Sequence, residues 1–142
     1  PTEYFLDLCN KIIDKNPNVH FLIYGGPSQK EKEKLDLLIN GLSSYATSFV
    51  GNSLRETAAI MSKTSLYIGV DTGPTHIMST FNVPMVVLFH CKLKSNIYGA
   101  LEHPCYFAID HPNKKNCDEN SAMSDISVRT VLDSVDKALY GR

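Results

Sequence analysis

Residues 65–89 limit the fold of this chain more than any other stretch of its sequence. Leu66 to Val70 is a short apolar run, as expected for a strand buried on both faces. Asp71-Thr72-Gly73-Pro74 follows it, where glycine allows backbone angles closed to other residues and proline suits the first turn of a helix. His76 to Phe81 is long enough for two helical turns, and Pro84 to Phe89 is a second apolar run of strand length. The stretch therefore predicts strand, tight turn, short helix and strand.

The turn after the first of these strands is a candidate anion site. Amides of Thr72, Gly73 and the first helical turn would point out of the carboxyl edge of a parallel sheet, where ligands of open sheets bind. Free amides and the helix dipole attract an anion, and a side chain larger than glycine would block its approach. Asp71 is placed to accept hydrogen bonds from hydroxyl groups, and His76 to donate to a phosphate oxygen. The alternative is that Asp71 only caps the helix and that His76 is a surface side chain.

The composition indicates one soluble globular domain over residues 1–142, because 43% of the residues are apolar and 20% are charged. The formal net charge of −1 gives no field that would recruit nucleic acid or an anionic membrane. No apolar run is long enough to cross a bilayer. The four cysteines form no C-x-x-C pair, so reduced thiols are the simplest interpretation, with a disulfide as the alternative.

The rest of the chain also alternates between strand and helix patterns. Further strands are predicted at 19–24, 46–50 and 105–109, and further helices at 2–15, after Ser28, at 54–62 and after Ser127. Short connections of this kind imply right-handed crossovers and a parallel sheet. The predicted fold class is an α/β three-layer sandwich.

Two capping boxes mark helix starts in the first half of the chain. In the first, Glu31 is expected to reach back to the amide of Ser28. The second is formed by Ser53 and Glu56, and Leu54 is expected to be buried in the helix that follows. Gly25-Gly26, after the strand at 19–24, makes a second glycine turn, which we expect at the same sheet edge as Gly73.

The string D-T-G-P-T-H-I-M-S-T-F-N-V-P-M-V-V-L-F, from Asp71, resembles the signature of the heptosyltransferase family, glycosyltransferase family 9. G-N-S-L-R-E-T-A-A-I-M-S and the earlier F-L-I-Y-G-G-P are similar to the family's preceding segments, in the same order and at family spacing. The resemblance implies a Rossmann-like fold, the C-terminal donor-binding half of a two-domain GT-B glycosyltransferase. Pro1 falls where the family has the proline of a Lys-x-Trp-Pro element, so we expect the chain to be a fragment.

The resemblance also implies a function. The parent enzyme would be an inverting glycosyltransferase that moves heptose from ADP-heptose to a lipopolysaccharide core or a related bacterial glycan. It would need no cofactor and no metal, and its base would lie in the missing N-terminal domain, which also meets the acceptor. We therefore expect no catalytic residue in this fragment, which alone would be inactive. The enzyme is expected in the cytoplasm, at the inner face of the bacterial inner membrane through peripheral association, without nucleic-acid partners.

The family's binding residues carry over onto matching positions of this chain. The diphosphate and sugar would be bound by the segment that follows the central strand: Asp71, Thr72, Gly73, Pro74, Thr75 and His76. The nucleotide would contact two earlier loops: Gly25, Gly26, Glu31, Asn52, Ser53 and Leu54. The chain departs from the family after Phe89, where His90-Cys91 replaces a glycine, and this departure bears on the sugar portion of the donor.

Three alternatives stay open at this point. One is a catalytically inactive nucleotide-sugar-binding module. Another is an aspartic-protease-like protein, because Asp71-Thr72-Gly73 also resembles that element; such enzymes need two aspartates on an all-β scaffold, and this chain has one D-T-G. The third is a metal site of Asp71, His76 and His90, which is not expected because no two histidines stand four residues apart on a helix and there is no C-x-x-C.

Overall fold

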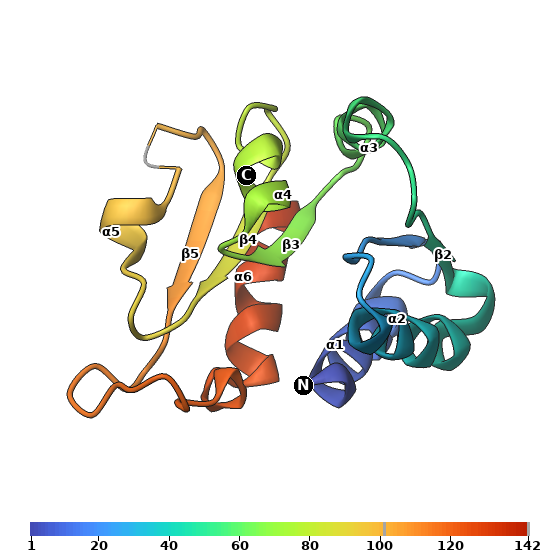
Figure 1. The fold of residues 1–142 in the computed structure, drawn as a ribbon. Helices are drawn as coiled ribbons and strands as arrows, with labels where there is room; N and C mark the ends of the chain where they lie inside the picture. Colours follow the sequence, from blue (N-terminus) through green and yellow to red (C-terminus); the bar gives the residue numbers. More distant parts are fainter. Residues whose placement is uncertain (101, 142) are drawn as a thin grey trace. The chain divides into compact units, whose positions relative to one another are not determined.

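The computed structural model describes residues 1–100 and 102–141, and it forms two compact units (Figure 1). The first unit is Pro1–Thr57 and the second is Ala58–Arg142. Helix α3, Leu54–Met61, contains the boundary between the two. That residues 1–142 act as one nucleotide-sugar-binding domain stays a prediction.

The first unit packs two helices with a small parallel sheet. Its elements are α1 (Thr2–Lys15), β1 (Phe21–Ile23), α2 (Gln29–Leu42), a 3-10 turn (Ser43–Tyr45) and β2 (Ala46–Ser48). Strands β1 and β2 pair in parallel, and α1 packs against α2. The predicted apolar stripes supply the core residues Leu8, Cys9, Ile12, Leu35 and Leu42. Pro1 occupies the N-cap position of α1, and no side chain caps this helix.

The second unit is a three-stranded parallel sheet in the order β3-β4-β5, with α6 packed against β4 and β5 (Figure 1). Its elements after α3 are β3 (Tyr67–Val70), α4 (Gly73–Met78), β4 (Met85–Phe89), α5 (Ser95–Tyr98), β5 (Tyr106–Asp110), a 3-10 turn (Met123–Asp125) and α6 (Val128–Tyr140). Ser127 caps α6 by accepting a hydrogen bond from the amide of Thr130, as predicted. β4 is the central strand.

All five residues of strand β4 are buried. A strand that is covered on both faces requires an uninterrupted apolar run of this kind. Met85, Val87 and Phe89 alternate onto one face, where they join a core cluster with Met61, Met78 and Val83. Met78 comes from α4, so this core fixes the short helix beside the end of β3. The core thus positions the turn that carries Asp71 to His76.

The predicted α/β class with parallel strands is confirmed, and the all-β scaffold required by the aspartic-protease alternative is excluded. The strands form two separate sheets, because each hydrogen-bonded ladder lies within one unit. The short helix α5 was not predicted, since its four residues are too few to show helical periodicity. Among the described residues, no helix has the length and apolar character needed to span a membrane.

The buried thiol of Cys9 gives a first testable consequence of this core. Burial raises the pKa of Cys9 to about 11, so about one thiol in a thousand is ionised at pH 8, and the thiolate is the form that reacts. In the native, reduced chain, iodoacetamide should therefore label Cys105, which is partly exposed, much faster than Cys9. Mass spectrometry of the labelled peptides measures both rates. Equal labelling in the native state would contradict this packing, whereas in urea the two rates should converge.

Candidate functional site

The turn between β3 and α4 holds the six residues that the sequence singles out for the diphosphate and sugar. Asp71 follows directly after β3, and Thr72 is the extended N-cap residue of α4, with φ −147° and ψ 173°. Gly73 and Pro74 are the first two residues of the helix, which ends at Met78. The helix therefore starts three residues earlier than its predicted start at His76, because proline is accommodated in a first helical turn.

Thr75 links α4 to β3 through hydrogen bonds of its side chain. Its side chain is buried, with 5% of the residue exposed, and its hydroxyl donates to the carbonyl oxygen of Val70. The same hydroxyl lies 2.9 Å from the hydroxyl of Tyr67. The Thr75 side chain thus has a structural role, and only its backbone amide remains for a ligand.

The start of α4 has fewer backbone amides without an acceptor in the helix than the sequence suggests. The first hydrogen bond of α4 runs from the amide of His76 to the carbonyl oxygen of Thr72, at 3.3 Å. The amides of Thr72, Gly73 and Thr75 precede it and have no acceptor within the helix. Pro74 has no N–H to donate, so three amides, not four, precede the first hydrogen bond of the helix.

Neither unusual backbone angles nor close protein neighbours require a glycine at position 73. Its φ lies outside the left-handed region, which among the glycines of the described residues is occupied only by Gly51, at φ 88°. The expectation that Gly73 adopts angles closed to other residues is therefore wrong. A Cβ added at Gly73 would meet no heavy atom within 4 Å, so the space in front of its backbone is open. Open space is what an approaching ligand requires.

One carboxylate oxygen of Asp71 is buried without a hydrogen-bond partner among the described residues. The Asp71 side chain is 11% exposed, and the buried oxygen without a partner is Oδ1. Nε2 of His76 lies 3.2 Å from Oδ1, within the distance of an ion pair but without hydrogen-bond geometry. Asp71 does not cap α4, because Thr72 occupies the N-cap position. A buried acceptor of this kind calls for an explanation, and a ligand hydroxyl supplies one.

Gly25, Gly26 and Glu31 form a compact corner in the first unit. Glu31 donates its amide to the Ser28 hydroxyl at 3.2 Å, and its carboxylate accepts from the same hydroxyl at 2.9 Å. The predicted contact of Glu31 with the Ser28 amide is therefore replaced by one with the hydroxyl. A Cβ at Gly26 would collide with the Glu31 carboxylate, so this glycine makes room for the capping side chain.

Asn52, Ser53 and Leu54 precede α3, and the capping box predicted there is present. The Ser53 amide donates to the Glu56 carboxylate at 2.8 Å, and the Glu56 amide donates to the Ser53 hydroxyl at 3.2 Å. These hydrogen bonds lower the pKa of Glu56. Leu54 is 67% exposed, which overturns its predicted burial, because it faces solvent at the start of the helix. An exposed leucine leaves an apolar surface beside this loop.

The two sets of residues belong to different units, and the prediction that the two glycine turns share one sheet edge stays a prediction. The structure also forms a group that sequence reasoning missed, in which His90 lies beside a disulfide between Cys91 and Cys117. The interpretation of four reduced thiols is therefore wrong for this pair. The cysteines are 26 residues apart, and no local spacing signals their contact. The metal triple of Asp71, His76 and His90 does not converge among the described residues.

Comparison with known proteins places this geometry in a family. The model of glycosyltransferase family 9, heptosyltransferase, matches residues 1–123. The lipopolysaccharide core heptosyltransferase OpsX of Haemophilus influenzae is 26% identical over 89 residues, which is 61% of this chain and 26% of that protein.

Solved structures agree in fold. E. coli heptosyltransferase WaaC with ADP aligns at a TM-score of 0.78 with 15% identity, over 97% of this chain and 39% of that one. E. coli ADP-heptose lps heptosyltransferase II aligns at a TM-score of 0.78 with 17% identity, over 98% of this chain and 41% of that one. A glycosyl transferase of family 9 from Veillonella parvula aligns at a TM-score of 0.76 with 19% identity, over 100% of this chain and 42% of that one. The chain thus spans less than half the length of these proteins, and it belongs to glycosyltransferase family 9, the heptosyltransferase family.

Proposed function

We propose that this chain is the donor-binding part of a glycosyltransferase that transfers heptose from ADP-heptose to a lipopolysaccharide core or a related bacterial glycan. Membership of the heptosyltransferase family supports the reaction class. The solved WaaC structure that shares its fold holds ADP, and OpsX is described as acting on the lipopolysaccharide core. The single observation that carries the proposal is the buried Oδ1 of Asp71, which has no hydrogen-bond partner among the described residues, at the turn that starts α4.

In the proposed complex, the amides of Thr72, Gly73 and Thr75 donate to the diphosphate. His76, whose side chain is 63% exposed, donates to a phosphate oxygen, and Asp71 accepts from hydroxyl groups of the donor. Cleavage of the glycosidic bond leaves negative charge on the nucleoside diphosphate. Fixed donors at that position stabilise the growing charge without rearranging during the reaction.

The remaining parts of the proposal concern the parent protein. The general base for inversion would come from the N-terminal domain, together with the acceptor site, so this chain alone would bind the donor without transferring the sugar. Metal-free transfer, nucleotide contacts from Gly25, Gly26, Glu31 and Asn52 to Leu54, and cytoplasmic action at the inner membrane face belong to the same proposal. Sugar transfer assays with the complete parent protein decide between an active enzyme and an inactive binding module.

Isothermal titration of the chain with ADP tests the proposed site. We expect wild type to bind ADP, and His76→Ala to weaken binding by about 10- to 100-fold, because a hydrogen bond to a charged group contributes about 1.5–3 kcal/mol. His20→Ala is the control, since His20 is an exposed histidine hydrogen-bonded to Thr47. Absence of heat with wild type, or equal affinity in the His76 variant, would refute the assignment.

A thermal-shift panel of nucleotide sugars tests the identity of the donor. A ligand that binds only the folded state raises stability by RT ln(1 + [L]/Kd). ADP-linked sugars should therefore raise the melting temperature more than UDP- or GDP-linked sugars at equal concentration. A larger shift with UDP- or GDP-linked sugars would keep the nucleotide-sugar site but reject ADP-heptose as the donor.

A further inference from the structure

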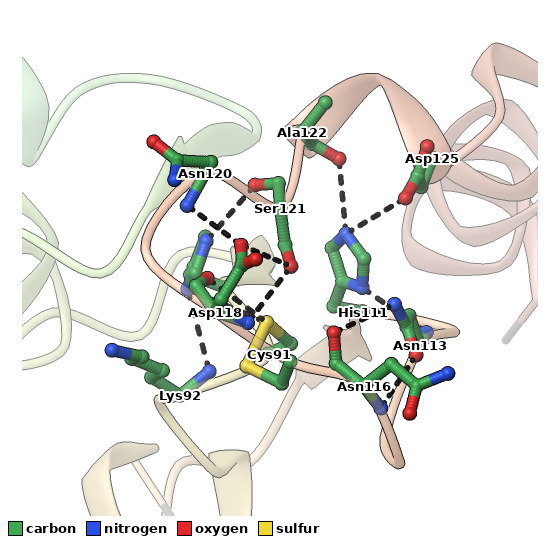
Figure 2. Close-up of polar contacts among 12 residues, drawn as sticks. Cys91, Lys92, His111, Asn113, Asn116, Asp118, Asn120, Ser121, Ala122 and Asp125 are labelled. Carbon is green, nitrogen blue, oxygen red and sulfur yellow. Dashed lines mark hydrogen bonds and ion pairs between the residues drawn. A yellow bond between two sulfur atoms is a disulfide. The ribbon is translucent and has the colours of Figure 1, made fainter.

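A cluster of one histidine and two cysteines lies in the second unit, outside the turn that carries Asp71. His90 and Cys91 follow directly after β4, and Cys117 lies in the long connection between β5 and α6. One ring nitrogen of His90 and the two sulfur atoms all lie within 4.8 Å of one another. The cysteines are joined as a disulfide, with 5.7 Å between their Cα atoms (Figure 2). Two loops that are far apart in sequence are thus brought together at a set of N and S atoms.

The hydrogen bonds of His90 fix which nitrogen faces the sulfurs. Nε2 lies 3.0 Å from the carbonyl oxygen of Ser121, which accepts hydrogen bonds only, so Nε2 carries the proton. Nδ1 accepts a 3.3 Å hydrogen bond from the amide of Lys92, which confirms that it holds the lone pair. Nδ1 also lies 3.7 Å from Sγ of Cys91. A metal-binding histidine has this arrangement, with one nitrogen donating to a carbonyl and the other directed to the metal.

We propose that His90, Cys91 and Cys117 bind a zinc ion when the disulfide is reduced. Tetrahedral zinc with its usual bond lengths would place two thiolate sulfurs about 3.8 Å apart and a sulfur and a nitrogen about 3.6 Å apart. The observed 3.7 Å between Nδ1 of His90 and Sγ of Cys91 already fits that second distance. The two sulfurs have to separate, Sγ of Cys117 has to reach bonding distance of the same ion, and the metal replaces the weak hydrogen bond from Lys92. Water completes the fourth position.

Hydrogen bonds order the connection between β5 and α6 on both sides of Cys117. His111 is 1% exposed, and its Nε2 lies 2.9 Å from the carbonyl oxygen of Ala122. Figure 2 shows this contact beside the turn in which the amide of Asn120 donates to the Asp118 carboxylate at 2.8 Å. On the other side of Cys117, the amide of Asn116 donates to the side-chain oxygen of Asn113 at 3.2 Å. Cys117 therefore lies between two hydrogen-bonded turns, close to its binding position.

Neighbouring groups are unsuited as further ligands. The ring of His111 lies 5.9 Å from that of His90, and among the described residues only His90, Cys91 and Cys117 bring their ligand atoms within 4.8 Å of one another. Oδ1 of Asp118 accepts hydrogen bonds from Asn120 and Ser121, and no carboxylate oxygen of the described residues lies within 4.8 Å of all three ligand atoms. The protein thus offers one imidazole and two thiolates, a donor set that favours zinc over magnesium or calcium.

Reduction of the disulfide and binding of zinc each conserve electrons and protons. A dithiol reductant gives up two electrons and two protons to the Cys91–Cys117 bond, becomes a disulfide itself and leaves two protein thiols. Zinc then binds both sulfurs as thiolates, and two protons are released. Cytosolic thiols are kept reduced, so the proposed location of the enzyme would favour the zinc-binding form. The site does not depend on the donor assignment, because none of its ligands belongs to the proposed donor site.

Cobalt titration of the whole chain tests the site. The protein is reduced, the reductant is removed without oxygen, and Co²⁺ is added as a spectroscopic substitute for zinc. We expect one equivalent to produce a sulfur-to-cobalt charge-transfer band together with the visible bands of tetrahedral cobalt, and Zn²⁺ to abolish both. His90→Gln and Cys117→Ser should each weaken binding by more than about 100-fold, beyond the 10- to 100-fold effect of losing a supporting contact.

The controls separate a metal site from general thiol chemistry. Cys105→Ser, which removes a free cysteine outside the cluster, should bind cobalt as wild type does, and the oxidised chain should show no charge-transfer band. Circular dichroism verifies the fold of each variant, and His90→Gln decides if Cys117→Ser does not fold, because it keeps both cysteines. A reduced wild type without the band, or a His90→Gln variant with unchanged affinity, would overturn the proposal. Neither result would affect nucleotide binding, which is measured separately.

Discussion

Replacing Phe89 with alanine is expected to lower the free energy of unfolding by about 3 to 5 kcal/mol. Phe89 is fully buried at the carboxyl end of β4, where it packs in the same cluster as Met61 and Met78. Truncation removes the buried ring and leaves a cavity in a core that cannot fully collapse. A single domain is stabilised by about 5–15 kcal/mol in total, so the loss would be a large fraction of the whole.

Tyr140→Ala is the matched control for this substitution. Tyr140 is an aromatic residue of the same unit, but it lies 60% exposed on α6, so its truncation should change stability by no more than about 0.5 kcal/mol. Urea denaturation followed by circular dichroism measures both variants. A loss below about 1 kcal/mol at Phe89, or the same loss at Tyr140, would show that β4 is not the centre of this core.

The strands and capped helices could be predicted because their signals are local. β4 is an uninterrupted apolar run, and the starts of α2 and α6 are marked by Ser28 and Ser127, whose hydroxyls accept from amides three residues on. Strand ends shifted by a few residues, as at β1, where hydrogen-bond pairing with β2 sets the length. Periodicity identifies an element, but its bounds depend on its neighbours.

Features that depend on distant contacts could not be predicted in this way. His111 is a polar residue, yet it is buried, and a loop eleven residues away supplies the carbonyl oxygen of Ala122 to its ring. The Cys91–Cys117 pair likewise depends on how two connections fold over the ends of β4 and β5. Leu54 has an apolar side chain but lies exposed, since its place at the start of a helix leaves nothing to cover it. None of these outcomes has a local sequence signal.

The candidate site also combines a feature that the sequence predicts with one that it does not. Its location after β3 was predictable, because a buried strand followed by Asp71-Thr72-Gly73-Pro74 ends at a sheet edge. The reason for the glycine was not, since sequence alone cannot distinguish a residue that needs unusual backbone angles from one that leaves room in front of the chain. In the proposed complex, the open space at Gly73 gives this residue the second role.

Gly73→Val should therefore abolish most ADP binding while leaving the fold intact. A Cβ at position 73 would meet no heavy atom within 4 Å, so we expect the melting temperature to stay near that of wild type. The added side chain would, however, stand where the diphosphate approaches the amides of Gly73 and Thr75. Losing two hydrogen bonds to a charged ligand costs about 3 kcal/mol or more, which corresponds to a loss of affinity of at least about 100-fold.

Thr80→Ala supplies the comparison within the same segment. Thr80 is exposed just beyond the far end of α4, and its hydroxyl donates to the carbonyl oxygen of Ile77, so its loss should leave ADP affinity unchanged. Isothermal titration gives the affinities and thermal unfolding gives the stabilities. Wild-type affinity in Gly73→Val would mean that the diphosphate does not approach this backbone. An unfolded variant would mean that the space is filled by protein, because a valine side chain in open solvent has nothing to displace except a ligand.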